Sequence, residues 1–166
     1  PKEGSYVNLI DGNTSTFFHS IYSETGPTTP HNLQIDMVTP VQKVFFKFTG
    51  RSGDYHDTPN DINVYVTNND VLGKDPNSAD AEWIAVSHLT DGFPADASEA
   101  KYTSPNFELT QACRYLRLVV NNTTTAANGR VNSTTQLPYF NFSEFQVYNG
   151  APSAKSEYNM VAGMKD

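Results

Sequence analysis

The stretch Asn8–Ser20, NLIDGNTSTFFHS, holds the densest group of oxygen-bearing side chains in the sequence. Asp11, Asn13, Ser15 and Thr16 fall close together, and a glycine between the first two permits a tight turn. Calcium binds about six to eight oxygen ligands, some of them backbone carbonyls, and such a loop can supply them. An ordinary Asx turn before a strand has the same composition. The residues alone therefore predict either a calcium loop or a turn.

The rest of the chain favours strands and turns over helices. Its 166 residues suffice for one domain with a sizeable core, and ten Phe, nine Tyr, ten Gly and ten Pro suit strands joined by turns. Alternating apolar positions predict strands near residues 32–38, 41–49, 61–67, 83–88, 106–109, 115–120 and 142–148. Long loops rich in Gly, Pro, Asn, Asp and Ser separate them. This order predicts an all-β sandwich or jelly roll.

Charge and cysteine content narrow the possible partners. The formal net charge is −7 and the Lys and Arg residues are scattered singly, so there is no basic stripe to neutralise phosphates and we expect no nucleic-acid partner. Cys113 is the single cysteine, which rules out a disulfide within the chain, and its place before a strand-like run predicts burial.

The chain reads as an excised module. Its start, PKEGSYVNLI, lacks the pattern of a signal peptide, and no apolar run approaches the length of a membrane span. We expect the folded module at residues 1–150. The polar segment at 151–166 is expected to be a C-terminal tail or linker.

Five segments in order carry a resemblance to a known family. NLIDGNTSTFFHS is followed by HNLQIDM (31–37), INVYVTNND (62–70), RYLRLVV (114–120) and FSEFQVY (142–148). In order and spacing they resemble the discoidin, or coagulation-factor type C, family, and most of all carbohydrate-binding module family 32. The resemblance implies an eight-stranded, galactose-binding-like jelly-roll β-sandwich of the kind attached to bacterial glycan-processing enzymes.

The resemblance also implies a structural calcium ion. Its ligands would be the backbone carbonyls of Leu9, Asn13 and Thr16, the side chains of Asp11 and Thr16, and the carboxylate of Glu144. Glu144 would then tie the last of the five segments to the first loop. The family often has Asp where this chain has Asn13, a change that a backbone carbonyl ligand survives.

A sugar site needs an aromatic face for the apolar side of the ring and donors and acceptors for its hydroxyls. Galactose-binding family members use a His just before the HNLQIDM-type strand and an Arg after the next strand. His31 and Arg51 hold the matching places, so the resemblance implies that both contact the sugar. The structural alternative is that His31 caps a strand and Arg51 pairs with Asp54 or Asp57.

Nearby loops hold the other side chains suited to a sugar. The residues after Arg51 offer hydrogen-bonding groups and an aromatic ring, and a carboxylate there can fix the guanidinium fork. LPYFNF (137–142) is preferred over HSIYSE (19–24) as the source of a stacking ring, although the former can instead cover the core. His19 is interpreted as structural. The further sugar-binding candidates are Asp54, Tyr55, His56, Tyr22, Tyr139 and Phe140.

The strongest case for an enzyme is a glycosidase that pairs Asp54 with Asp57 or Asp61. These carboxylates share a polar loop, where acidic groups are usually solvated, and the sequence contains no nucleophile, phosphate or zinc motif. We therefore expect a non-catalytic module that recognises a terminal sugar. The resemblance favours galactose or N-acetylgalactosamine.

Two other functions stay open at this point: a protein- or membrane-adhesion module, and a structural spacer with an inactive sugar site. Polar loops and the charge of −7 disfavour binding to an anionic membrane. The resemblance implies one part of a larger, multidomain glycan-processing protein that is secreted and extracellular, periplasmic or attached to the cell surface. We expect a bacterial source and a monomer.

Overall fold

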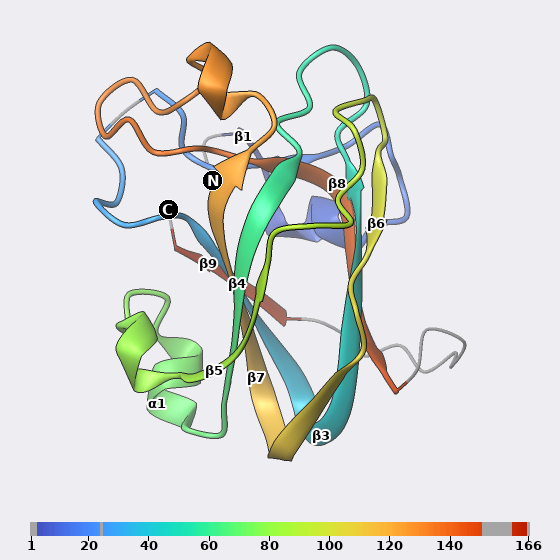
Figure 1. Cartoon of the computed structure of the whole chain (residues 1–166), viewed down its shortest axis with the longest axis vertical. Helices are drawn as coiled ribbons and strands as arrows, with labels where there is room; N and C mark the ends of the chain where they lie inside the picture. Colours follow the sequence, from blue (N-terminus) through green and yellow to red (C-terminus); the bar gives the residue numbers. More distant parts are fainter. Residues whose placement is uncertain (1–2, 24, 151–160, 166) are drawn as a thin grey trace.

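The computed structural model describes residues 3–23, 25–150 and the backbone of 161–165. Within these residues the chain forms nine strands, one short α-helix and three 3-10 helices (Figure 1). In chain order they are β1 (Glu3–Gly4), η1 (Tyr6–Leu9), β2 (Phe18–His19), β3 (Asn32–Gly50), β4 (Pro59–Thr67), α1 (Asp70–Lys74), η2 (Asp80–Glu82), β5 (Ile84–Leu89), β6 (Lys101–Thr103), β7 (Phe107–Thr123), η3 (Ala126–Asn128), β8 (Asn141–Asn149) and β9 (Val161–Lys165). The expected all-β architecture is confirmed.

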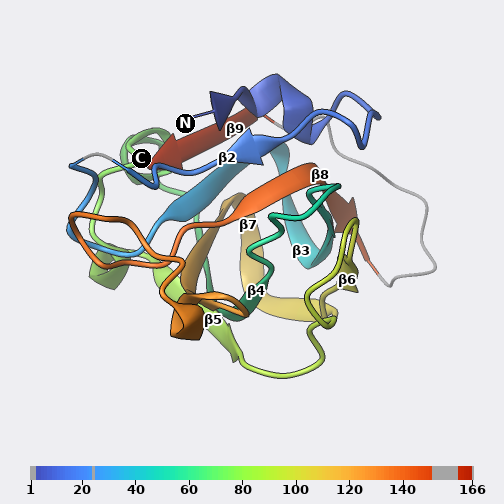
Figure 2. The ribbon, with the colours of Figure 1, turned by 90° about the horizontal axis from the view of Figure 1, so that it is seen from above.

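Two long strands, β3 and β7, belong to both layers of the sandwich. The first part of β3 pairs with β7 at Asn32–Val119 through Asp36–Tyr115, whereas its second part pairs with β8 from Val44 to Gly50. One layer continues through β7 to β4 and β5, and the other through β8 to β2 and β1. Figure 2 shows β2 and β8 on one side of the molecule and β4 and β5 on the other. Because the ladder is continuous across the bend, the layers close into a jelly roll.

The bend in β3 has a local cause. Val38 adopts a left-handed backbone with φ of 67°, and its N–H donates to the Asp36 carboxylate over 2.7 Å. That carboxylate also receives two hydrogen bonds from Arg114 on β7, at 2.7 and 2.8 Å. The sequence predicted two separate strands here; the structure joins them across this turn.

Aromatic rings fill the space between the layers. Phe46, Phe48, Phe142 and Phe145 are buried and stack on one another with ring centroids 4.6 to 6.0 Å apart. Each carries a large apolar area, so this cluster supplies much of the hydrophobic stabilisation. Cys113 is fully buried, as predicted.

A buried Arg fixes the α1–η2 segment, which lies at the lower end of the molecule in Figure 1. Arg117 is 0% exposed, donates to Asp80 over 2.6 Å and to Gln34 over 2.8 and 3.0 Å, and lies 4.3 Å from the ring centroid of Trp83. Trp83 is itself buried, so it is part of the apolar interior.

The C-terminal strand β9 pairs antiparallel with the first part of β3, from Asp36 to Asn32. Residues 151–160, the start of the expected tail or linker, lie outside the described part of the chain. The module boundary at residue 150 stays a prediction.

Candidate functional site

A cavity of about 310 Å³ lies where the loop between β3 and β4 approaches the loop that follows η3, at the upper end of the molecule in Figure 1. Segments far apart in the sequence line it. The lining residues are Glu3, His19, Tyr22, Arg51, Tyr55, Arg130 and Tyr139. Three phenol rings, two guanidinium groups, an imidazole and a carboxylate therefore face one space.

One wall of the cavity is a cluster of three rings. His19 on β2 lies 4.8 Å from Tyr22 and 5.3 Å from Tyr139, and the two Tyr rings are 5.8 Å apart, all between centroids. The Nδ1 atom of His19 lies 2.7 Å from the carbonyl oxygen of Ser20, which can only accept, so Nδ1 carries the proton and Nε2 is an acceptor. Burial lowers the pKa of His19, which keeps this neutral form.

Arg130 is held in place by a buried carboxylate. Its Nε and Nη2 atoms each donate to Asp57 over 2.7 Å, and Asp57, which is 0% exposed, also accepts from Thr125 over 2.6 Å and Asn141 over 3.0 Å. This hydrogen bonding raises the pKa of Arg130. The fixed guanidinium lies 4.8 Å from the ring centroid of Tyr55, so the pair forms a rigid part of the rim.

Arg51, directly after β3, is the other cation of the cavity. Its guanidinium lies 3.7 Å from the ring centroid of Phe17. Within the described residues it forms no ion pair with a carboxylate, unlike Arg130, so its N–H donors are free for a ligand. The carboxylate of Glu3 accepts from the Tyr22 hydroxyl over 3.3 Å and adds a hydrogen-bond acceptor to the cavity lining.

Comparison with known proteins identifies the fold. No protein-family model and no curated protein matches the sequence. Among solved structures, a family 32 carbohydrate-binding module from Clostridium perfringens, in complex with GalNAc-β-1,3-galactose, matches with a TM-score of 0.55 and 15% identity over 89% of this chain and 85% of that one. The chain has the fold of the family 32 carbohydrate-binding modules.

Two further modules from the same organism share this fold. One belongs to a family 31 glycoside hydrolase and has a TM-score of 0.57 and 17% identity, over 87% of this chain and 81% of that one. The other, from NanJ in complex with galactose, has a TM-score of 0.53 and 12% identity, over 84% and 81%. At these identities the likeness concerns the fold.

The cavity of the module contains four of the eight sugar-binding candidates, Arg51, Tyr55, Tyr22 and Tyr139. Two others are buried away from it. His31 is 1% exposed and precedes β3, and Phe140 is 0% exposed and packs on Phe18 and Phe142. Phe140 belongs to the hydrophobic core. Neither His31 nor Phe140 lines the cavity, and a contact of either with a sugar stays a prediction.

The last two candidates lie in the β3–β4 loop outside the cavity. Asp54 is exposed. His56 contacts Asp96 over 3.2 Å through Nδ1 and the carbonyl of Gly53 through Nε2, so it joins this loop to the one after β5. The role of His56 in the structure is to hold the loop that carries Tyr55.

Sequence reasoning missed three residues of the cavity: His19, which was interpreted as structural, Glu3 and Arg130. Arg130 is the single charged residue in the long loop between β7 and β8, a signal that the sequence did offer. The position of His19 three residues before Tyr22 was a second signal. Glu3 had none, because only strand pairing of β1 with β2 brings it to the site.

The carboxylates considered for a glycosidase are occupied elsewhere. Both oxygens of Asp57 accept from Arg130, and Asp61 contacts His88 over 2.7 Å and Asn121 over 2.9 Å. Neither lines the cavity, and neither does Asp54. These carboxylates therefore do not form a facing pair in the cavity.

The loop after η1 has the hydrogen bonds of an Asx turn. Asp11 accepts from the N–H of Asn13 over 2.9 Å and from the hydroxyl of Thr16 over 2.6 Å. Gly12 adopts a left-handed backbone with φ of 72°, which a side chain would strain. The turn gathers the Asp11 carboxylate, the Asn13 carbonyl and the Thr16 hydroxyl on one side.

Glu144 on β8 lies against this turn. Glu144 is buried, and this burial, followed by the nearby Asp11 carboxylate, raises the pKa of its carboxyl group. Oε2 accepts from Gln146 over 3.2 Å, whereas Oε1 is buried and has no hydrogen-bonding partner in the described residues. Two carboxylates with a hydroxyl, carbonyl groups and an unpartnered buried oxygen are a donor set that fits calcium, a cation that prefers oxygen ligands.

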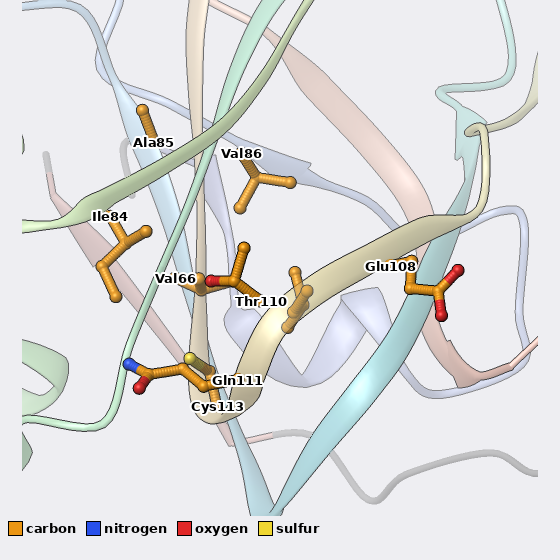
Figure 3. Close-up of a pocket in the computed structure, with 9 residues that line it drawn as sticks. Val66, Ile84, Ala85, Val86, Glu108, Thr110, Gln111 and Cys113 are labelled. Atoms are coloured by element: carbon orange, nitrogen blue, oxygen red, sulfur yellow. The ribbon is translucent and has the colours of Figure 1, made fainter.

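A second hollow, of about 140 Å³, lies between β5, the end of β4 and the first part of β7. Figure 3 shows Ile84, Val86 and Cys113 around it. Burial raises the pKa of the Cys113 thiol, which keeps it protonated. Aliphatic side chains predominate in the lining of this hollow, and none of its lining residues is aromatic, so it lacks the stacking surface that the first cavity offers a sugar.

Proposed function

We propose that the module is a non-catalytic carbohydrate-binding module that recognises a terminal sugar of the galactose or N-acetylgalactosamine type. The observation that carries this proposal is the cavity itself, in which packed aromatic rings meet two guanidinium groups and an acceptor imidazole. The sugars named in the complexes of two solved structures with this fold support the choice of ligand.

The chemistry of the cavity suits a sugar ring. The rings of Tyr22 and Tyr139 offer an apolar surface for the C–H face of the sugar. Arg51 supplies free donors, and Nε2 of His19 supplies an acceptor for a hydroxyl proton. Because donor and acceptor lie beside the same stacking surface, one ring can satisfy both while it stacks.

Calcium is the structural ion of this proposal. The residues that would hold it are Leu9, Asp11, Asn13 and Thr16 of the turn and Glu144 of β8. The unpartnered Oε1 of Glu144 beside the Asp11 carboxylate supports this assignment. When bound, the cation neutralises the two carboxylates and links the turn to the sheet, so it stabilises the fold without contacting the sugar.

We further propose that the module is one domain of a larger glycan-processing protein and acts outside the cytoplasm. The solved module that belongs to a family 31 glycoside hydrolase supports the first part. No helix in the described residues is long and apolar enough to cross a membrane.

A glycan array tests the proposal, with the module applied in calcium and again after chelation. We expect the module to bind to spots whose glycans end in galactose or N-acetylgalactosamine. In a separate sedimentation assay with anionic liposomes, the module should stay in solution. Val71→Ala, at an exposed position on α1, serves as the control variant. Failure to retain any glycan in the presence of calcium would overturn the proposal, and sedimentation with liposomes would favour adhesion to membranes.

A further inference from the structure

Tyr55 is an exposed aromatic residue at the rim of the cavity. Its side chain is 58% exposed, and it is the one aromatic residue among the exposed large hydrophobic residues of the described chain. Tyr139 is 9% exposed, and both it and Tyr22 pack on His19. Because Tyr55 also lines the cavity, its exposed ring offers a stacking face to a ligand that extends out of the cavity.

The ring of Tyr55 is fixed from behind. The guanidinium of Arg130 lies 4.8 Å from its centroid, and Arg130 is itself held by the two hydrogen bonds to the fully buried Asp57. A chain of contacts thus leads from the interior to the rim. A ligand that stacks on Tyr55 meets a surface whose orientation has already been set, which lowers the entropic cost of binding.

Arg130 also separates two stacking surfaces. Its guanidinium lies 4.8 Å from the Tyr55 ring centroid and 5.8 Å from that of Tyr139, which belongs to the ring cluster with His19 and Tyr22. Asp57 occupies its Nε and Nη2 atoms, which leaves Nη1 for another acceptor. The cavity therefore holds an enclosed aromatic wall and an exposed aromatic rim with a donor between them.

We infer that the site recognises at least two consecutive sugar units, an inference that rests on the proposed carbohydrate-binding function. The terminal unit packs against the enclosed wall of His19, Tyr22 and Tyr139. The next unit stacks on Tyr55, and Nη1 of Arg130 donates to an oxygen at or near the linkage. The glycan leaves past Tyr55, because that side of the cavity is open to solvent.

Isothermal titration with N-acetylgalactosamine, the terminal unit alone, and with GalNAc-β-1,3-galactose measures the contribution of the second unit. The disaccharide is expected to bind on the order of tenfold more tightly, since burying roughly 50 Å² of apolar surface corresponds to about that factor. In Tyr55→Ala the dissociation constants of the monosaccharide and the disaccharide should become about equal. Tyr55→Phe keeps the stacking face and should keep the ratio of these constants.

Saturation-transfer NMR gives a second readout. Protons of the galactose unit of the disaccharide should receive saturation in the wild-type module and in Tyr55→Phe but lose it in Tyr55→Ala, while melting temperature shows that each variant is folded. Three results would each overturn the two-unit site. The wild-type module could bind the monosaccharide and the disaccharide with equal dissociation constants, Tyr55→Ala could keep the wild-type ratio of these constants, or Tyr55→Ala could lose binding of both sugars together. If the wild-type module binds neither sugar, the proposed function fails as well.

Discussion

Arg130 and Asp57 form an ion pair, and we expect substitution of the two residues to lower the free energy of unfolding by different amounts. Asp57 is 0% exposed, whereas the side chain of Arg130 is 30% exposed. Removing Arg130 leaves a carboxylate that water cannot reach, while neutralising Asp57 leaves a guanidinium that can turn toward solvent. The free energy of unfolding should therefore fall more for the arginine variant than for the aspartate variant.

The magnitudes follow from the contacts. Arg130→Met leaves the buried Asp57 carboxylate with Thr125 and Asn141 as its remaining hydrogen-bond donors, and such a loss costs about 4 kcal/mol. Asp57→Asn keeps the shape and tolerates the left-handed backbone at φ of 46°, but its amide faces the donors of Arg130 and Asn141, so we expect a cost of about 2 kcal/mol. Adding Asp57→Asn to Arg130→Met removes the stranded charge and should restore part of the lost stability.

Urea unfolding followed by the fluorescence of Trp83, the single tryptophan, measures these three variants. Lys74→Met provides a control, because Lys74 and Asp70 form an exposed pair at 3.9 Å that should contribute under about 0.5 kcal/mol. The reasoning is refuted if Asp57→Asn costs as much as Arg130→Met, or if the double variant is less stable than Arg130→Met alone.

Three further predictions concern the cavity and the turn that we propose to bind calcium. Arg51→Ala should abolish sugar binding in titration calorimetry while the melting temperature changes little, because the Arg51 guanidinium packs on the Phe17 ring and forms no ion pair within the described residues; unchanged affinity would remove Arg51 from the site. Chelation should lower the melting temperature of the wild-type module but not of Glu144→Gln, and a wild-type module indifferent to chelator would contradict the calcium site. Burial holds the pKa of His19 below its unfolded value of about 6.5, and the charge of Arg51 acts in the same direction. The Ser20 carbonyl and the charges of Asp57 and Glu3 oppose this shift. Protonation then favours the unfolded chain, so the free energy of unfolding should fall as pH drops below about 6.5, and His19→Gln should flatten that slope in urea titrations at different pH. An equal slope in both proteins would contradict it.

Local patterns in the sequence were enough to locate the longer strands of the sandwich. Alternation in Asp61–Thr67 and Tyr115–Val120 predicted β4 and the second half of β7, because side chains of a strand point to opposite faces with a period of two. The short strands β1, β2 and β6 escaped prediction, since two or three residues carry no periodicity. They form only because longer neighbours offer them a partner.

The sequence does not decide which way a side chain next to a strand faces. His31 and His19 are both buried His residues close to a strand, yet the second lines the cavity and the first does not. A shift of one residue in register moves a side chain to the opposite face, and no property of the isolated segment fixes that register. Phe140 and Tyr139 show the same effect, since these adjacent residues point to the core and to the cavity.

By itself the sequence determined the all-β class and the oxygen-rich turn from Asp11 to Thr16, because both depend on neighbours within a few positions along the chain. Only the tertiary structure decided which residues meet in the cavity that we propose as the sugar site. Its walls come from β2, the β3–β4 loop and the long loop before β8, and Arg130 reaches its fixing carboxylate, Asp57, across 73 positions. Contacts over such a separation form when the layers pack, since packing is what brings those loops to one end of the sandwich.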